Sequence, residues 1–206
     1  MLDGTDWRRT LGKWSGIAFL VAGVSVSIAA IAMAVVLFTD MSQGMITGLP
    51  TMVGLLISYL GMLGLYPGLA ARNRRAALAG IVLLLFPVIG IAFWLGHALV
   101  VGQEPSYANL LVGLVFGGFV IGLALYGITS YRLQVPSQRV GLALLALAVP
   151  WVVLLGSGIV YGGNAPAWLD FVATSMMGGL LLVIGYLTWT ESSMTTPEEP
   201  TPDPAA

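Results

Sequence analysis

The sequence contains no cysteine, a single histidine (His97) and a single lysine (Lys13) among its 206 residues. Without cysteine the chain forms no disulfide, no thiolate nucleophile and no iron–sulfur ligation. One histidine cannot supply the two axial ligands of a bis-histidine haem, and a zinc site needs three or four ligands. We therefore expect no cofactor and no metal.

Charge is also scarce. Charged residues make up 8% of the chain, whereas a soluble domain carries about 25%. Hydrophobic residues make up 58%, and the mean hydropathy is +0.94. The net charge of −1 and the lack of basic patches argue against nucleic acid as a partner. Apolar runs exceed the ~18 residues that indicate a membrane span, so the sequence predicts an all-α integral membrane protein whose main partner is the lipid bilayer.

Six apolar segments follow one another, at about 14–38, 48–71, 76–100, 107–131, 140–162 and 168–190. Each is long enough to cross a ~30 Å hydrocarbon core as a helix. The predicted organisation is a cytoplasmic N-terminal segment (1–13), a six-helix transmembrane domain (14–190) and a tail (191–206). The tail is rich in proline and acidic residues, which predicts a disordered segment.

The basic residues set the predicted topology. Under the six-helix prediction all eight fall on one side: Arg8, Arg9, Lys13, Arg72, Arg74, Arg75, Arg132 and Arg139. The opposite connections contain no Lys or Arg, and their charged residues are the acids Asp40, Glu104 and Asp170. The positive-inside rule then places both termini in the cytoplasm of a cell-membrane protein.

The N-terminus also loosely resembles a twin-arginine export signal, because "RRTLGK" precedes an apolar stretch with "AIA" at 30–32. However, Gly12 stands where that signal prefers a bulky apolar residue. The apolar stretch, of about 23 residues, also exceeds the 7–15 of a signal peptide. We expect the first helix to be retained as an anchor, and its cleavage stays an alternative.

Three tyrosines, Tyr66, Tyr126 and Tyr186, recur 60 residues apart near the cytoplasmic ends of the even-numbered helices. This spacing predicts three tandem helical hairpins of similar length, although chance spacing of common residues remains an alternative. Aromatic residues at helix ends are typical of head-group anchors. The predicted anchors are Tyr66, Tyr126, Tyr186, Trp14, Trp94, Trp168 and Trp189.

Few residues are candidates for ligand binding. His97 lies toward the outer end of the third helix, and Pro87 and Pro150 lie within the third and fifth helices. Prolines break some transporter helices beside the substrate site, but they also occur as packed kinks. The histidine has the alternative of an interfacial residue that bonds water or a carbonyl. No charged residue lies in the middle of a predicted span, which argues against a proton-coupled mechanism.

Ser157, in "LLGSGIVYGGN", lacks a credible general base, so we predict no catalytic residue and no enzyme. Small residues also recur four positions apart and predict close helix packing. These pairs are Gly113 with Gly117, Gly118 with Gly122, Ser175 with Gly179, Gly158 with Gly162, and Ala92 with Gly96.

Two stretches, "LGLYPGLAARNRRAALAGIVLL" and "VPSQRVGLALLALAVPW", resemble uncharacterised multi-pass membrane proteins of archaea, particularly haloarchaeal ones. The hairpin plan also weakly resembles the HdeD-like acid-resistance membrane proteins. The first likeness covers about half the chain, and the second concerns architecture. Both imply a small six-helix membrane protein, and neither brings a motif with assigned chemistry.

Two functions follow. The favoured one is a non-enzymatic multi-pass membrane protein, an accessory subunit or membrane-stress factor with a membrane-protein partner or a second copy. The alternative is a small permease for an uncharged or lipophilic solute.

Overall fold

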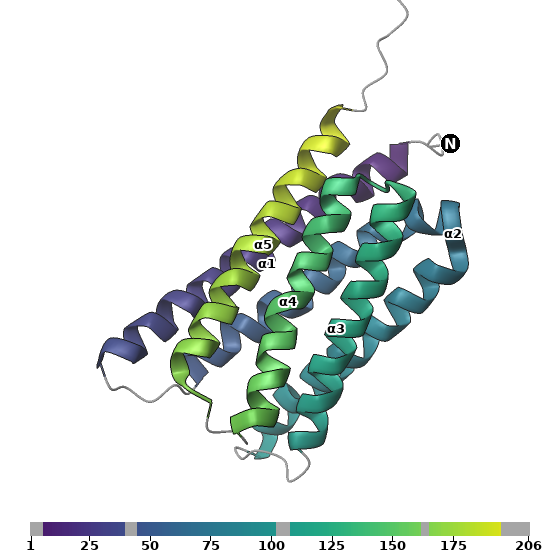
Figure 1. Cartoon of the computed structure of the whole chain (residues 1–206). Helices are drawn as coiled ribbons and strands as arrows, with labels where there is room; N and C mark the ends of the chain where they lie inside the picture. The colour runs from purple at the N-terminus through teal and green to yellow at the C-terminus, as the bar shows by residue number, and fades with distance from the viewer. Residues whose placement is uncertain (1–5, 40–44, 102–107, 162–164, 195–206) are drawn as a thin grey trace, which may run out of the picture.

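The computed structural model describes residues 6–39, 45–101, 108–161 and 165–194, and every secondary-structure element in this part of the chain is an α-helix. The helices are α1 (Asp6–Thr39), α2 (Met45–Val101), α3 (Ala108–Leu133), α4 (Gln138–Tyr161) and α5 (Ala167–Met194) (Figure 1). All five are long and apolar enough to cross a membrane. The all-α class is thereby confirmed, and the length and apolar composition of the helices support a membrane-embedded protein.

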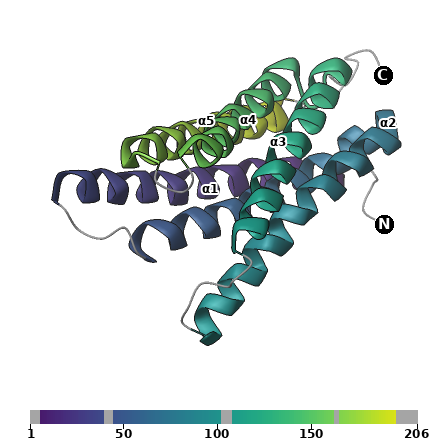
Figure 2. The same cartoon turned by 60° about the horizontal axis from the view of Figure 1, so that its bottom comes forward.

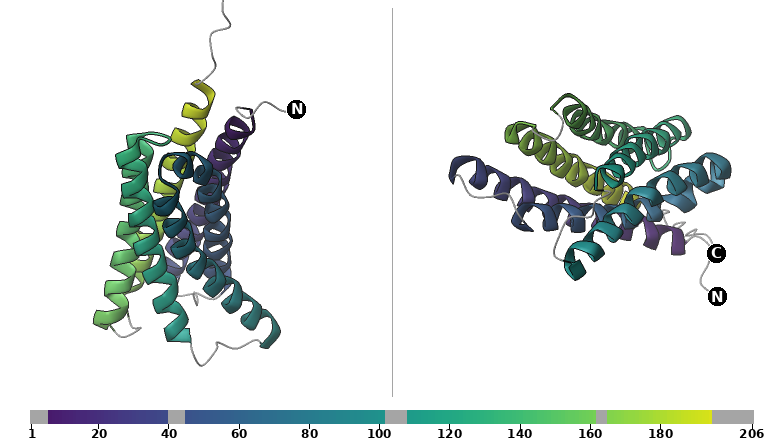
Figure 3. Two further views of the ribbon diagram at one scale, coloured as in Figure 1. Left: turned by 90° about the vertical axis from the view of Figure 1, so that its right-hand side faces the viewer. Right: turned by 90° about the horizontal axis from the view of Figure 1, so that it is seen from below.

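The helix α2 is interrupted in its middle. Its 57 residues would span about 85 Å as one rod, far more than a ~30 Å hydrocarbon core. Asn73 has non-helical backbone angles (φ −150°, ψ 89°), and its Oδ1 accepts a hydrogen bond from the Ala76 amide at 3.1 Å, as a helix N-cap does. The arms before and after it (residues 45–72 and 74–101) run in opposite directions (Figures 1 and 3). The predicted helices 48–71 and 76–100 are therefore the two arms of one element.

Two predicted boundaries change. The helix α1 begins at Asp6, within the predicted N-terminal segment, and α5 continues to Met194, past the predicted end at 190. In the last turns of α5 the Ser192 hydroxyl donates to the Thr188 carbonyl at 2.7 Å. The apolar run marks only the part of a helix that suits lipid, so polar end turns were missed. Asp40, Glu104 and the tail from residue 195 lie outside the described residues.

The helices form a closed ring. Each packs against its neighbour in sequence, and α5 packs against α1 (Figure 2; Figure 3, right). The core between them contains Phe119, Leu123, Leu144 and Ile184, all at most 1% exposed. The outer surface also carries large apolar side chains, among them Ile28 and Val152. An apolar surface of this extent is unsuited to water and indicates lipid as the surrounding medium.

Glycines allow the helix backbones to approach each other. A Cβ added to Gly185 of α5 would lie 2.7 Å from the Leu20 nitrogen of α1. Of the predicted pairs, Gly118 and Gly122 make similarly close contacts, with Pro87 and Leu84 of the second arm of α2. The remaining glycines of those pairs that the structure describes have no heavy atom within 4 Å of such a Cβ: Gly96, Gly113, Gly117, Gly158 and Gly179. Among the predicted pairs, close packing is thus found at Gly118 and Gly122, and other glycines such as Gly185 provide it elsewhere in the bundle.

Two helix pairs share one register. Gly118 of α3 meets Pro87, and Gly178 of α5, 60 residues later, meets Ser27 of α1, 60 residues before Pro87. The pair formed by α1 and α5 therefore repeats the pairing of α3 with the second arm of α2. This agrees with an internal repeat of that length, while the division into three hairpins stays a prediction.

The described ends of the bundle differ in charge. The start of α1, the joint at Asn73, the α3–α4 turn and the end of α5 lie at one end (Figure 1). We call this the basic end, because the Lys and Arg side chains that the structure describes are here: Lys13, Arg72, Arg74, Arg75, Arg132 and Arg139. The helices also bring Arg8 and Arg9 of α1 to this end.

Candidate functional site

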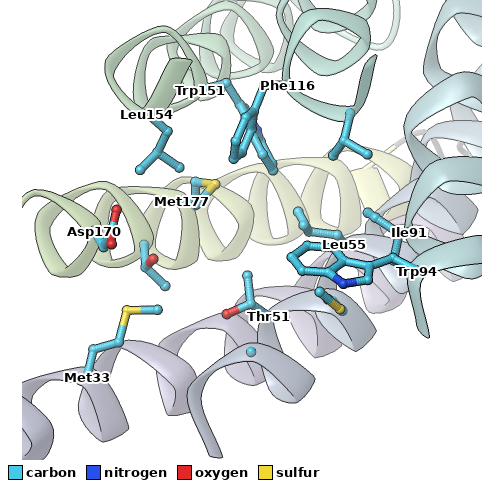
Figure 4. Close-up of a pocket in the computed structure, with 14 residues that line it drawn as sticks. Met33, Thr51, Leu55, Ile91, Trp94, Phe116, Trp151, Leu154, Asp170 and Met177 are labelled. Carbon is cyan, nitrogen blue, oxygen red and sulfur yellow. The ribbon is translucent and has the colours of Figure 1, made fainter. Parts of the chain in front are cut away.

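A cavity of about 300 Å³ lies between the helices toward the end away from the basic residues (Figure 4). All five helices line it, and α2 contributes residues from both arms: Leu55 from the first, Ile91 and Trp94 from the second. Most of the lining is apolar. Its volume falls at the lower end of the range for small-molecule pockets, which are typically apolar with a few polar groups.

Aromatic rings form one wall. The Trp151 ring of α4 stacks on Phe119 of α3, with centroids 4.4 Å apart and planes 11° apart. It also contacts Phe116 at 5.2 Å with a tilt of 49°. Trp151 and Phe116 face the cavity, and Phe119 supports Trp151 from the core. Because Phe119 and Trp151 are buried, this wall is held in place before any ligand arrives.

Asp170 is the charged residue of this site. Of the described residues that line the cavity, it alone is ionisable, and it lies in the first turn of α5. No hydrogen bond or ion pair to its carboxyl group is found within the described ranges. Thr51 and Thr174 are the other polar side chains of the lining, and the Thr51 hydroxyl already donates to the Thr47 carbonyl at 3.0 Å. The described lining is therefore mostly apolar and contains one acid whose carboxyl group has no partner among the described residues.

The three ligand-binding candidates from the sequence do not line this cavity. Pro87 and Pro150 are buried inside the helical backbone of the second arm of α2 and of α4, and Pro87 packs on Gly118. His97 is half-buried near the end of α2, and it interacts with another group of the protein. Residues close to them line the cavity instead, namely Trp94 and Trp151. The binding role of His97, Pro87 and Pro150 stays an untested prediction.

Most of the predicted anchor side chains are exposed or half-buried, as contact with lipid head groups requires. Trp14 is 64% exposed, and Trp168, Tyr186 and Trp189 are also exposed, whereas Tyr66 and Trp94 are half-buried. Whether these six rings lie at head-group depth stays a prediction.

For Tyr126 the anchor prediction is wrong, because this side chain is fully buried. Its hydroxyl donates to the Met62 carbonyl at 2.8 Å, and its ring lies 2.8 Å from where a Cβ on Gly80 would be. The position 60 residues before Gly80 is occupied by Leu20, and the corresponding tyrosine, Tyr186, is exposed. A missing Cβ on the facing helix thus decides which tyrosine enters the core.

Sequence reasoning missed Asp170 as a site residue and treated it only as an acid of a connection. A signal was present in "WLDFVATSMM", because Asp170, Thr174 and Met177 follow each other at four and three positions. Such residues share one helix face, and all three line the cavity. A carboxyl group on the same face as buried residues indicates an internal position.

Neither metal ligation nor nucleophilic catalysis finds support in the described residues. They contain no group of three or more His, Cys, Asp or Glu side chains close enough to hold a metal ion. The Ser157 hydroxyl donates to the Leu154 carbonyl of its own helix at 2.8 Å.

Comparisons of the chain with protein-family models, with curated proteins and with solved structures found no match. The cavity is therefore the main guide to function.

Proposed function

We propose that the chain is a non-enzymatic multi-pass membrane protein that takes a small lipophilic molecule into the cavity, as a small permease does. The observation that carries this proposal is the cavity itself, built from all five helices and lined by the rigid Trp151–Phe116 wall. A bundle that served only as a structural partner would gain packing energy by filling this space with side chains. The accessory-subunit and membrane-stress hypotheses stay predictions, supported by the apolar outer surface alone.

The proposal includes six membrane crossings, with one for each arm of α2 and both termini in the cytoplasm. It is supported by the break at Asn73 and by the clustering of Lys and Arg at the basic end. In this orientation the cavity lies toward the outer face of the cell membrane. Toward the basic end the core is closed by buried side chains such as Leu69, Leu123 and Tyr126. In the proposed carrier, this conformation is closed toward the cytoplasm.

Filling the cavity should abolish binding. Thr51 projects into it (Figure 4), so Thr51→Phe places a ring in the binding space. The probe is para-bromophenyl-tert-butylethane, an uncharged lipophilic compound whose bromine quenches nearby tryptophans. We expect saturable quenching of the wild-type protein in lipid nanodiscs and at least a tenfold weaker saturable component in the variant, as for a ligand that loses most of its burial.

Val53→Phe is the matched control, because Val53 lies two residues along the same arm and is exposed on the outer surface. It adds the same ring without entering the cavity and should quench as the wild type does. Quenching that is unsaturable in the wild type, or equal in all three proteins, would contradict a binding cavity. Co-purification of another polypeptide in native mass spectrometry would then favour the accessory-subunit hypothesis.

A further inference from the structure

We infer that the ligand of this cavity is an amphiphilic organic cation, with its ammonium head at Asp170 and its apolar body against Trp151, Phe116 and Trp94. The inference rests on the proposed function, since it names the chemical class of the molecule that the same cavity holds. It follows from the charge of the lining, from the position of the charge and from the distance between charge and aromatic wall.

The electrostatics of the cavity favour a cation. The described lining contains one carboxyl group and no Lys, Arg or His. The described Lys and Arg side chains lie at the basic end, at the opposite ends of the same helices. An ionised carboxylate next to apolar surface is unfavourable unless it is paired, and the residues that the structure describes supply no partner for Asp170. A ligand cation would supply the missing partner.

The separation between Asp170 and the aromatic wall favours an elongated ligand. Asp170 and Met177 line the cavity two turns apart on α5, a separation of about 10 Å along the helix. Figure 4 shows Met177 between Asp170 and the pair formed by Trp151 and Phe116. An ammonium group at Asp170 therefore places a ring or short alkyl chain of similar length on the aromatic wall.

A purely structural role for Asp170 is the alternative. An acid in the first turn of a helix is stabilised by the helix dipole, and Asp170 occupies such a position. A capping carboxylate normally accepts a hydrogen bond from a free backbone amide. Asp170 accepts none among the described residues and instead borders the cavity. The dipole stabilises the anion without neutralising it, and the carboxylate remains available to a ligand.

The test compares two molecules of the same shape. One is para-bromophenethyl-trimethylammonium, and the other is its carbon isostere, in which a tert-butyl group replaces the trimethylammonium group. Both are titrated into nanodiscs of uncharged lipid that contain the full chain, and saturable tryptophan quenching gives each dissociation constant. We expect the cation to bind the wild type at least about tenfold more tightly than the isostere, the size of effect expected for a partly buried charge pair.

The variants locate the charge. Asp170→Asn should weaken cation binding by about tenfold or more and leave the isostere unchanged. Glu191→Gln removes a carboxyl group from the other end of α5, 21 residues away, and should change neither constant. If Asp170→Asn fails to fold, the ratio of the wild-type dissociation constants for the cation and its isostere still tests the cation assignment.

Equal binding of both molecules by the wild type would overturn the cation assignment and leave the binding cavity standing. Unchanged cation binding in a folded Asp170→Asn protein would overturn it as well. Saturable binding of neither molecule by the folded wild type would overturn the cation assignment and the proposed function together.

Discussion

Gly141→Ala is expected to destabilise the bundle by about 3 kcal/mol, because the added methyl group would collide with backbone and not with a movable side chain. In the wild type, the position of a Cβ on Gly141 of α4 overlaps the backbone nitrogen and Cα of Tyr131 on α3. The two helices would have to move apart over their whole contact. In lipid, where close helix packing replaces the hydrophobic drive, that contact is a main source of stability.

The measurement is the thermal unfolding midpoint of the purified protein in detergent, followed by tryptophan fluorescence. Gly156→Ala is the matched control on the same helix, since a Cβ there has no heavy atom within 4 Å. Alanine is a better helix former than glycine by up to about 1 kcal/mol, so the control should be neutral or slightly stabilised. Equal midpoints for both variants would show that the α3–α4 contact is looser than described.

Tyr126→Ala is expected to cost about 3–5 kcal/mol, the range for deleting a large buried aromatic side chain. The ring is fully buried and fills the space over Gly80, while its hydroxyl bonds the Met62 carbonyl. It thereby joins α3 to both arms of α2, which lie on either side of the break at Asn73. Removal leaves a void where three helical segments meet.

Tyr126→Phe separates the ring from the hydroxyl and should lose only about 1 kcal/mol, typical of one hydrogen bond inside a membrane protein. Tyr186→Ala is the control, because this tyrosine lies 60 residues later in the sequence and is 59% exposed. It should shift the unfolding midpoint by less than half as much as Tyr126→Ala. A larger effect at Tyr186 than at Tyr126 would contradict the burial described for the two rings.

Apolar run length predicted the helical class and most helix positions, because lipid selects apolar side chains on all sides of a span. It could not predict that two of the runs share one element, because that depends on the single non-helical residue Asn73 and its bond to Ala76. Helix ends were misplaced where Asp6 and Ser192 continue a helix in polar sequence.

The candidate site was harder to predict, since it depends on which faces meet across the ring. Trp94 appeared as an interface anchor and Asp170 as an acid of a connection, although both line one cavity. Tyr126 was misassigned for the same reason, because its burial depends on the absence of a side chain on Gly80 in another helix. Periodicity within one helix carries no information about the size of the residue that faces it.

The proposed function depends most on α2 crossing the membrane twice, since the proposal then has the basic end in the cytoplasm and the cavity toward the outer face. The absence of cysteine allows single cysteines to report topology without a background. The four variants are Ala71→Cys near the joint of α2, Gln134→Cys in the α3–α4 turn, Val101→Cys at the end of α2 and Tyr161→Cys at the end of α4, all exposed positions. With a membrane-impermeant maleimide on intact cells, we predict labelling of Val101→Cys and Tyr161→Cys, and labelling of the other two only after permeabilisation. Labelling of Ala71→Cys in intact cells, together with Val101→Cys, would contradict the double crossing and with it the proposed position of the cavity.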